Sequence, residues 1–315
     1  MPSPAERPPL IALVGPTGVG KTALSIRLAQ RIGAEIISAD SRLFYRGLDI
    51  GTDKPSPAVR RAVPHHLVDF LEPDETYSLA EFQAAVIRIS GEIRARGRLP
   101  LLAGGSGQYV RAIVEGWRIP EQPPDERLRA ALFALADTAG AEAVHRWLAV
   151  LDPEAAARID FRNARRSIRA LEVVLRTGRS FSRQSRRAEP RFRTLLLGLI
   201  RSRTELYERI DRRIDSMLAA GLVAEIAGLL DRGYSPELPA FSAIGYMEAA
   251  RHLRGEIDRD EMAAIMKKRS RTLVRRQANW FKAEDPDIHW IEMDAGALDR
   301  AESLVGRFLA HDDTV

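Results

Sequence analysis

The spacing of apolar residues divides the chain into short buried runs and longer amphipathic segments. Apolar runs with the length and boundaries of strands lie at residues 11–14, 34–40, 63–70, 99–103, 193–200 and 287–292. From 79 to 93, apolar residues recur every three or four positions, and Ser78 and Glu81 have the spacing of a capping box that begins a helix. Strands that alternate with helices predict a parallel sheet covered by helices.

The middle of the chain departs from this alternation. Further segments with helical spacing lie at residues 126–148, 152–179, 206–230, 258–282 and 301–309. A proline-rich linker at 119–125 precedes the first two segments, which have no strand pattern between them. We therefore predict an α/β core domain of residues 1–118 and 193–315, with an inserted small all-helical domain of residues 119–192.

The loop after the first strand matches the phosphate-binding pattern G-x-x-x-x-G-K-[ST] in full. Its residues are Gly15, Pro16, Thr17, Gly18, Val19, Gly20, Lys21 and Thr22. Glycines let backbone N–H groups line an anion site, and the helix that begins at about Lys21 directs its positive end at the same place. Lys21 would reach phosphate oxygens, and the Thr22 hydroxyl would bind Mg²⁺. The motif predicts a P-loop NTPase-like parallel sheet flanked by helices, without saying whether a phosphate is transferred.

Two further strands end in residues suited to such a site. Asp40 follows the second strand, at the edge where open parallel sheets bind ligands. Its carboxylate would hold Mg²⁺ through water, act as a base on a substrate proton, or cap the following turn. Ser106 follows the strand at 99–103 and would either face the phosphates or cap a helix. His65 and His66 have no cysteine or third histidine placed to complete a metal site, which favours a structural or substrate-shaping role for them.

Composition narrows the class of protein. Among the 315 residues there is no cysteine, which excludes disulfides and cysteine-based zinc sites and fits a reducing cytoplasm. No apolar stretch is long enough for a transmembrane helix, so we expect none. The proline-rich start of the chain lacks the apolar core of a signal peptide and indicates a short disordered lead.

The net charge of +5 is unevenly distributed. Residues 158–193 hold 12 arginines against three acidic residues, and residues 267–282 hold seven basic residues and no acidic one. These blocks either bind a polyanion such as nucleic acid or form solvated helix faces; the clustering favours the first. Arg209 and Arg213, one helical turn apart, would clamp phosphates or pair with acidic neighbours such as Glu205 and Asp211, and the sequence alone favours pairing.

Several motifs, taken in order, resemble those of the tRNA dimethylallyltransferase (tRNA isopentenyltransferase) family over nearly the whole chain. The matching stretches are residues 15–22, 38–41, 49–55, 64–67, 104–106, 169–173, 221–225, 244–246 and 275–277. The resemblance implies transfer of a dimethylallyl group from its diphosphate to the N6 amine of the adenine 3′-adjacent to the anticodon. The phosphate loop would then bind the diphosphate leaving group of an isoprenoid, with Mg²⁺, rather than ATP.

The resemblance also assigns roles to residues. The implied catalytic residues are Asp40, as general base, Ser106 and Asp125. The implied diphosphate site is the loop from Gly15 to Thr22 with Arg213, and the implied metal ligands are Thr22 and Asp40. Contacts with the tRNA anticodon stem-loop are implied for Asp40, Ser41, Arg42, Leu43, Arg165, Arg166, Ser167, Ile168, Arg169, Arg275, Arg276, Gln277 and Trp280. The family usually has threonine at the positions of Ser106 and Asn279 and a basic residue at Met247. A monomer in the cytoplasm is the implied state.

Two other functions fit the residues. A small-molecule or nucleoside kinase would use the same loop and would turn over ATP without RNA. A non-enzymatic RNA-binding protein would bind tRNA equally well after Lys21→Ala and would form no product.

Overall fold

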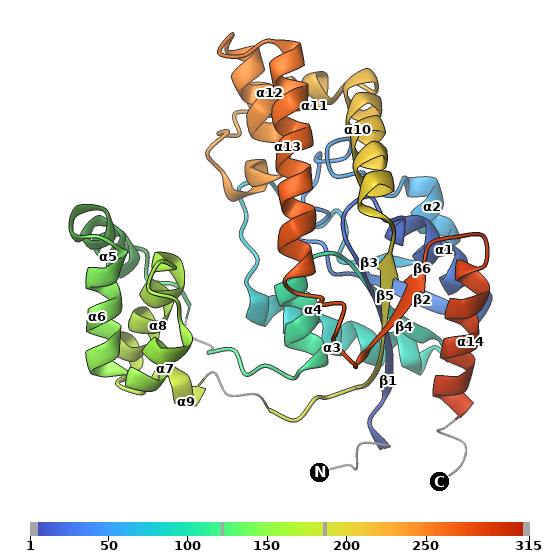
Figure 1. Cartoon of the computed structure of the whole chain (residues 1–315), viewed down its shortest axis with the longest axis horizontal. Helices are drawn as coiled ribbons and strands as arrows, with labels where there is room; N and C mark the ends of the chain where they lie inside the picture. The colour runs from blue at the N-terminus through green and yellow to red at the C-terminus, as the bar shows by residue number, and fades with distance from the viewer. Residues whose placement is uncertain (1–5, 121–122, 185–187, 311–315) are drawn as a thin grey trace. The chain divides into compact units, whose positions relative to one another are not determined.

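The computed structural model describes residues 6–120, 123–184 and 188–310 (Figure 1). Contacts within the chain divide it into two units. The core unit comprises Met1–Val114 and Arg191–Val315, and the helical unit comprises Glu115–Pro190. The predicted domain boundaries, at 119 and 192, fall within a few residues of this division. Within the described residues, no helix is long and apolar enough to cross a membrane.

The core unit is built on one six-stranded parallel sheet, which confirms the predicted fold class. Its strands are β1 (Pro9–Val14), β2 (Ala34–Ser38), β3 (His65–His66), β4 (Leu99–Ala103), β5 (Arg193–Ile200) and β6 (Ile288–Glu292). They lie in the order β3-β2-β4-β1-β5-β6. The central strand β1 is paired on both sides, so that Leu13 lies opposite Ala103 of β4 and Leu197 of β5. Residues 10–14 are fully buried, as expected of a strand covered on both faces.

Helices cover the two faces of this sheet. The core helices are α1 (Lys21–Ile32), α2 (Pro57–Ala62), α3 (Leu79–Ala95), α4 (Gly107–Val114), α10 (Arg203–Ala219), α11 (Leu222–Asp231), α12 (Tyr246–Leu253), α13 (Arg259–Ala278) and α14 (Ala297–Ala310). The β1–α1–β2 and β3–α3–β4 crossovers run in opposite directions along the sheet. Because such crossovers are right-handed, α1 and α3 lie on opposite faces. Helices α10–α13 form a group beyond the end of β5 (Figure 1).

Local signals explain where several elements begin and end. The capping box is present: Ser78 Oγ accepts from Glu81 N–H at 3.2 Å, and the Glu81 carboxylate accepts from Ser78 N–H at 2.7 Å. The predicted helix at 206–230 is broken in two, because Gly221 adopts a φ of 98°. The predicted strand at 63–70 shrinks to two residues, because Leu67 and Asp69 have left-handed backbone conformations.

The two histidines of β3 have structural partners. His66 Nε2 lies 2.7 Å from a Glu35 carboxylate oxygen, and His65 Nδ1 lies 2.7 Å from the carbonyl of Val63. Arg96 also donates to Glu35, at 2.7 Å. These contacts agree with the predicted structural role, and no cluster of potential metal ligands is found in the described part of the chain.

The helical unit has its own apolar core. Its helices are α5 (Glu126–Ala139), α6 (Ala141–Leu151), α7 (Pro153–Arg158), α8 (Ala164–Thr177) and α9 (Phe181–Gln184). The buried centre includes Leu132, Val144, Leu148, Ile168 and Leu171. The predicted helix at 126–148 is interrupted at Gly140, whose positive φ angle favours glycine, and the predicted helix at 152–179 is interrupted at residues 159–163, between α7 and α8.

Candidate active site

The carboxyl ends of three neighbouring strands are joined by backbone hydrogen bonds. Gly104, after β4, donates to the Leu13 carbonyl of β1 at 3.1 Å. Ala39, after β2, donates to the Ala103 carbonyl at 2.8 Å, and Ser106 donates back to Ala39 at 3.2 Å. A Cβ at Gly104 would overlap the Ala39 carbonyl, so the close approach needs glycine. The phosphate loop, Asp40 and Ser106 therefore meet at one edge of the sheet, as the sequence predicts.

The phosphate loop has the backbone geometry of an anion cradle. Gly15, Gly18 and Gly20 all have positive φ angles, of 150°, 84° and 108°. Gly20 is the N-cap of α1, which begins at Lys21 as predicted. The unpaired N–H groups of the first helical turn and the positive end of the helix dipole both face the loop.

Lys21 lies folded within this loop. Its ammonium group donates to the carbonyl of Gly15 at 2.8 Å and to that of Pro16 at 2.9 Å. Burial lowers the pKa of Lys21 from 10.5 to about 8; nearby Asp40 opposes this change and Arg213 adds to it. Lys21, Asp40 and Arg213 therefore act on one another electrostatically, although they come from distant parts of the chain.

These groups open onto a cavity of about 740 Å³. Its lining combines polar side chains with an apolar wall, which comes from α10, α13 and the segment between α11 and α12. The polar lining residues include Thr17, Lys21, Thr22, Asp40, Arg42, Asp53, Arg209 and Arg213. The apolar wall includes Ile210, Ile214, Met217, Ile244, Met266 and Leu273. A charged cradle beside an apolar wall suits a ligand with a phosphate head and a hydrocarbon chain.

The arginines of α10 face this cavity. Arg209 donates to the Gly18 carbonyl of the phosphate loop at 2.7 Å, and Arg213 lies 3.6 Å from the Asp53 carboxylate. Asp53 itself has a left-handed φ of 56°. Arg213 thus pairs with a carboxylate, as the sequence favours, but within the described residues neither arginine pairs with the suggested neighbours Glu205 and Asp211. Those two carboxylates instead pair with Arg201 and Arg271.

Asp40 and Ser106 are linked through the turn that follows β2. One Asp40 oxygen accepts from Arg42 N–H at 3.0 Å, so the carboxylate does cap the turn. The same carboxylate also lines the cavity, so capping the turn does not exclude a role in the active site. Ser106 Oγ accepts from Ser41 N–H at 3.3 Å, which ties the β4 end to the same turn.

The donor groups fit a phosphate-bound Mg²⁺. Thr22 and Asp40 both line the cavity and supply a hydroxyl and a carboxylate. Within the described residues, no group of three or more acidic or histidine side chains is gathered to hold a metal alone. Mg²⁺ commonly binds through one or two carboxylates together with substrate phosphates and water, and this donor set matches that chemistry.

The basic block at 267–282 is partly neutralised. Lys267, Arg269 and Arg271 pair with carboxylates on α10 and α12, whereas Arg275 and Arg276 are exposed at the end of α13. Across the described residues, neither of these two arginines forms a salt bridge, nor do the exposed Lys268 and Lys282, so these four residues carry the unpaired positive charge of the block. Trp280 is 38% exposed and Gln277 only 7%. The predicted RNA contacts at Arg275, Arg276 and Trp280 are therefore sterically available.

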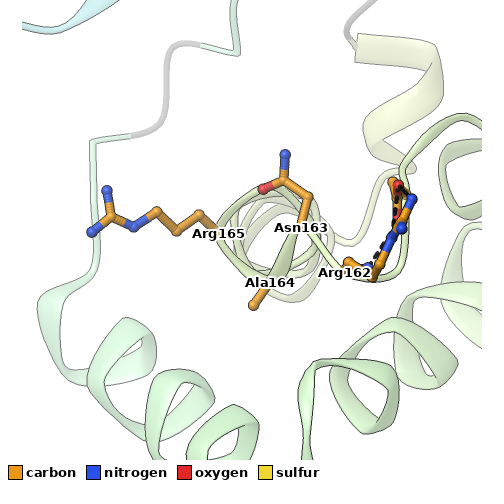
Figure 2. Close-up of a pocket in the computed structure, with 5 residues that line it drawn as sticks. Arg162, Asn163, Ala164 and Arg165 are labelled. Carbon is orange, nitrogen blue, oxygen red and sulfur yellow. Dashed lines mark hydrogen bonds and ion pairs between the residues drawn. The ribbon is translucent and has the colours of Figure 1, made fainter. Parts of the chain in front are cut away.

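The helical unit presents a second basic surface at the start of α8. Arg165 and Arg166 are exposed and, in the part of the chain described here, form no salt bridge. Figure 2 shows Arg165 extending from the helix on the side away from Arg162, whose guanidinium pairs with Asp160 at 2.6 Å. A shallow hollow of about 510 Å³ lies at the start of α8. It is lined by Asp160, Arg162, Asn163, Ala164 and Arg165.

Other predicted contacts in this unit have internal roles. The side chains of Ser167 and Ile168 are buried, which corrects the prediction that they contact RNA: they lie on the apolar face of α8. Arg169 pairs with the buried Glu172 at 2.5 Å. Glu172 also accepts from Asp125 N–H at 2.6 Å. The Asp125 carboxylate caps α5 through Leu128 N–H at 3.0 Å, and its catalytic role stays a prediction.

The fold and site define a phosphate-loop protein of the parallel α/β class. A profile of the IPP transferase family matches residues 43–284, and a profile of isopentenyl transferases matches residues 8–62. The chain therefore belongs to the IPP transferase family.

Relatives and solved structures agree with this membership. The tRNA dimethylallyltransferase of Thermomicrobium roseum is 50% identical over 91% of this chain and 87% of its own length. The tRNA dimethylallyltransferase of Dehalococcoides mccartyi is 43% identical over 96% of this chain and 93% of its own length. The crystal structure of a tRNA isopentenylpyrophosphate transferase from Bacillus halodurans is similar with a TM-score of 0.71 and 38% identity, covering 96% and 97%. A eukaryotic dimethylallyltransferase acting on tRNA gives a TM-score of 0.80 at 26% identity, covering 96% and 80%.

Proposed function

We propose that this protein transfers a dimethylallyl group from dimethylallyl diphosphate to the N6 amine of the adenine 3′-adjacent to the anticodon of tRNA, and releases diphosphate. The observation that carries the proposal is the single cavity that joins a complete phosphate loop, Asp40 and an apolar wall. The family relationship supports the same reaction. We expect the protein to be a monomer in the cytoplasm, which fits its lack of cysteine.

Different residues would act on the leaving group and on the nucleophile. As the C–O bond to the prenyl carbon breaks, negative charge develops on the diphosphate. Loop N–H groups, Lys21 and Arg213 stabilise that charge, and Mg²⁺ held by Thr22 and, through water, by Asp40 would neutralise more of it. The electron pair of the adenine amine forms the new C–N bond, and the Asp40 carboxylate accepts the amine proton.

The RNA must approach this cavity with the target base out of its stack. Arg275 and Arg276 on the core unit, and Arg165 and Arg166 on the helical unit, supply exposed charge for backbone phosphates. Trp280 offers an exposed aromatic face for a base.

The test is to incubate the protein with an anticodon stem-loop RNA, Mg²⁺ and dimethylallyl diphosphate and to weigh the RNA. A gain of one C5 unit on an adenine supports the proposal. An unchanged mass, when RNA and donor are both shown to bind, would refute it. A parallel reaction with ATP and no RNA tests the kinase alternative, which none of the relatives described above supports by name.

A further inference from the structure

We propose that Gln277 is a positioning residue that holds the phosphate loop in register with the Ser106 turn. Gln277 lies near the end of α13, and its side chain is 7% exposed. Its amide oxygen accepts from Thr17 N–H in the phosphate loop at 2.8 Å. Its amide nitrogen donates to the Gly105 carbonyl after β4 at 3.1 Å. The inference rests on the proposed function, because it concerns the geometry of that reaction.

The two partners fix the orientation of the amide. A backbone N–H can only donate and a carbonyl can only accept, so the oxygen must face Thr17 and the nitrogen must face Gly105. Glutamate lacks the donor for Gly105, methionine lacks both groups, and asparagine is one methylene short. Glutamine is therefore the side chain that makes both bonds at this span.

The neighbourhood leaves little freedom for this bridge. A Cβ at Gly105 would overlap the Gln277 amide nitrogen, so the strand end approaches the helix as closely as glycine allows. Trp280, one turn later, fills the space beside Gly107 in the same way. Arg111 on α4 donates to the Trp280 carbonyl at 2.9 Å. The end of α13 thus contacts the turn after β4 at Gln277, and the chain just beyond it contacts α4 at Trp280.

The two hydrogen bonds of Gln277 connect the loop that would hold the diphosphate with the turn that carries Ser106. Thr17 lies in the loop that would hold the departing diphosphate. Gly105 precedes Ser106, whose hydroxyl accepts from Ser41 N–H beside Asp40. A shift at Gln277 would therefore change the distance between the diphosphate cradle and the base. This role differs from RNA contact, because both amide atoms are used inside the protein.

The experiment compares Gln277→Met, which keeps the length of the side chain but removes both bonds, with Gln83→Met as the matched control. The Gln83 amide makes a bond of the same kind, to the Ala112 carbonyl at 3.0 Å, away from the loop. We expect Gln277→Met to lower kcat by about 10- to 100-fold, the usual cost of misplacing reacting groups by about an ångström. The Kd for the RNA stem-loop should stay within about a factor of two.

Hydrogen exchange supplies a readout that does not depend on turnover. The loop peptide that contains Thr17 should exchange faster in Gln277→Met than in the wild type, and Gln83→Met should leave it unchanged. Gln277→Glu is the second variant, in case the methionine variant does not fold. It keeps the acceptor for Thr17 but adds a negative charge beside the cradle, and should weaken binding of inorganic diphosphate with Mg²⁺, measured by calorimetry.

The possible results separate the alternatives. A weaker RNA Kd with an unchanged kcat would make Gln277 an RNA contact and overturn the inference. Loop exchange and kcat that match those of Gln83→Met would also overturn it. If the wild type itself forms no prenylated RNA, the proposed function fails, while the exchange and diphosphate-binding measurements still decide whether Gln277 orders the loop.

Discussion

The low pKa of Lys21 predicts that donor binding weakens in mildly alkaline solution. Burial holds this pKa at about 8 in the free protein, whereas the ordinary value is 10.5. A bound diphosphate stabilises the ammonium form and raises the pKa again. Between these two values the complex holds a proton that the free protein has lost, so the affinity falls as the pH rises.

The magnitude follows from the two pKa values. If the bound Lys21 returns to 10.5, the Kd for the diphosphate group rises only about twofold from pH 7 to pH 8, and then by roughly 40-fold from pH 8 to pH 10. The assay is calorimetric titration with a thiolo analogue of dimethylallyl diphosphate, which does not react. Its terminal phosphate is already ionised over this range, because phosphate monoesters lose their second proton near pH 6.

The pH above which the Kd rises steeply is the break in its pH dependence. Substitution of the two neighbouring charged residues should move this break in opposite directions. Asp40 raises the pKa of Lys21 and Arg213 lowers it, so Asp40→Asn should shift the break below pH 8 and Arg213→Gln should shift it above. Lys21→Arg is the control, because a guanidinium stays charged throughout and its weaker binding should be flat with pH. A wild-type Kd that is constant from pH 7 to pH 10 would refute the reasoning.

Three further predictions concern the base, the helical unit and the RNA surface. Asp40→Asn should lower single-turnover prenylation by about 10²- to 10⁴-fold while the donor still binds, as measured at pH 7; an undiminished rate would exclude Asp40 as the base. Glu172→Ala removes the carboxylate that Arg129 and Arg169 share. Because these arginines are 30% and 29% exposed, the change should destabilise the helical unit by about 1–3 kcal/mol, seen as faster hydrogen exchange confined to residues 115–190; exchange at the wild-type rate would count against the role of this carboxylate. Arg165→Gln should reduce the slope of log Kd for RNA against log salt by about 0.7–0.9, and an identical slope would show that this arginine touches no phosphate.

The parts of the fold that the sequence predicted depend on local signals. The phosphate loop, the capping box at Ser78 and the strand bounds at 99–103 and 193–200 are set by neighbouring residues, and the structure agrees with each. The break at Gly221 was missed because apolar residues continue at helical spacing on both sides of it. A glycine in a helical pattern is tolerated often enough that spacing alone does not locate a break.

The site was predicted where a motif names its residues and missed where partners are distant in the chain. Arg209 bonds to Gly18 across 191 positions, and Gln277 bonds to Thr17 across 260. No local pattern names the phosphate loop as their partner, although helical spacing from Met266, Ser270 and Val274 places Gln277 on the buried face of α13. Ile168 shows the reverse case, since the family resemblance placed it among RNA contacts although helical periodicity assigns it to the buried face of α8.

The most direct test of the account is a single-turnover reaction in which prenylated RNA and released diphosphate are counted together. The account predicts one diphosphate for each adenine modified, and no diphosphate release when the RNA is omitted. Release of orthophosphate, or release of diphosphate without a matching gain of mass on the RNA, would contradict it.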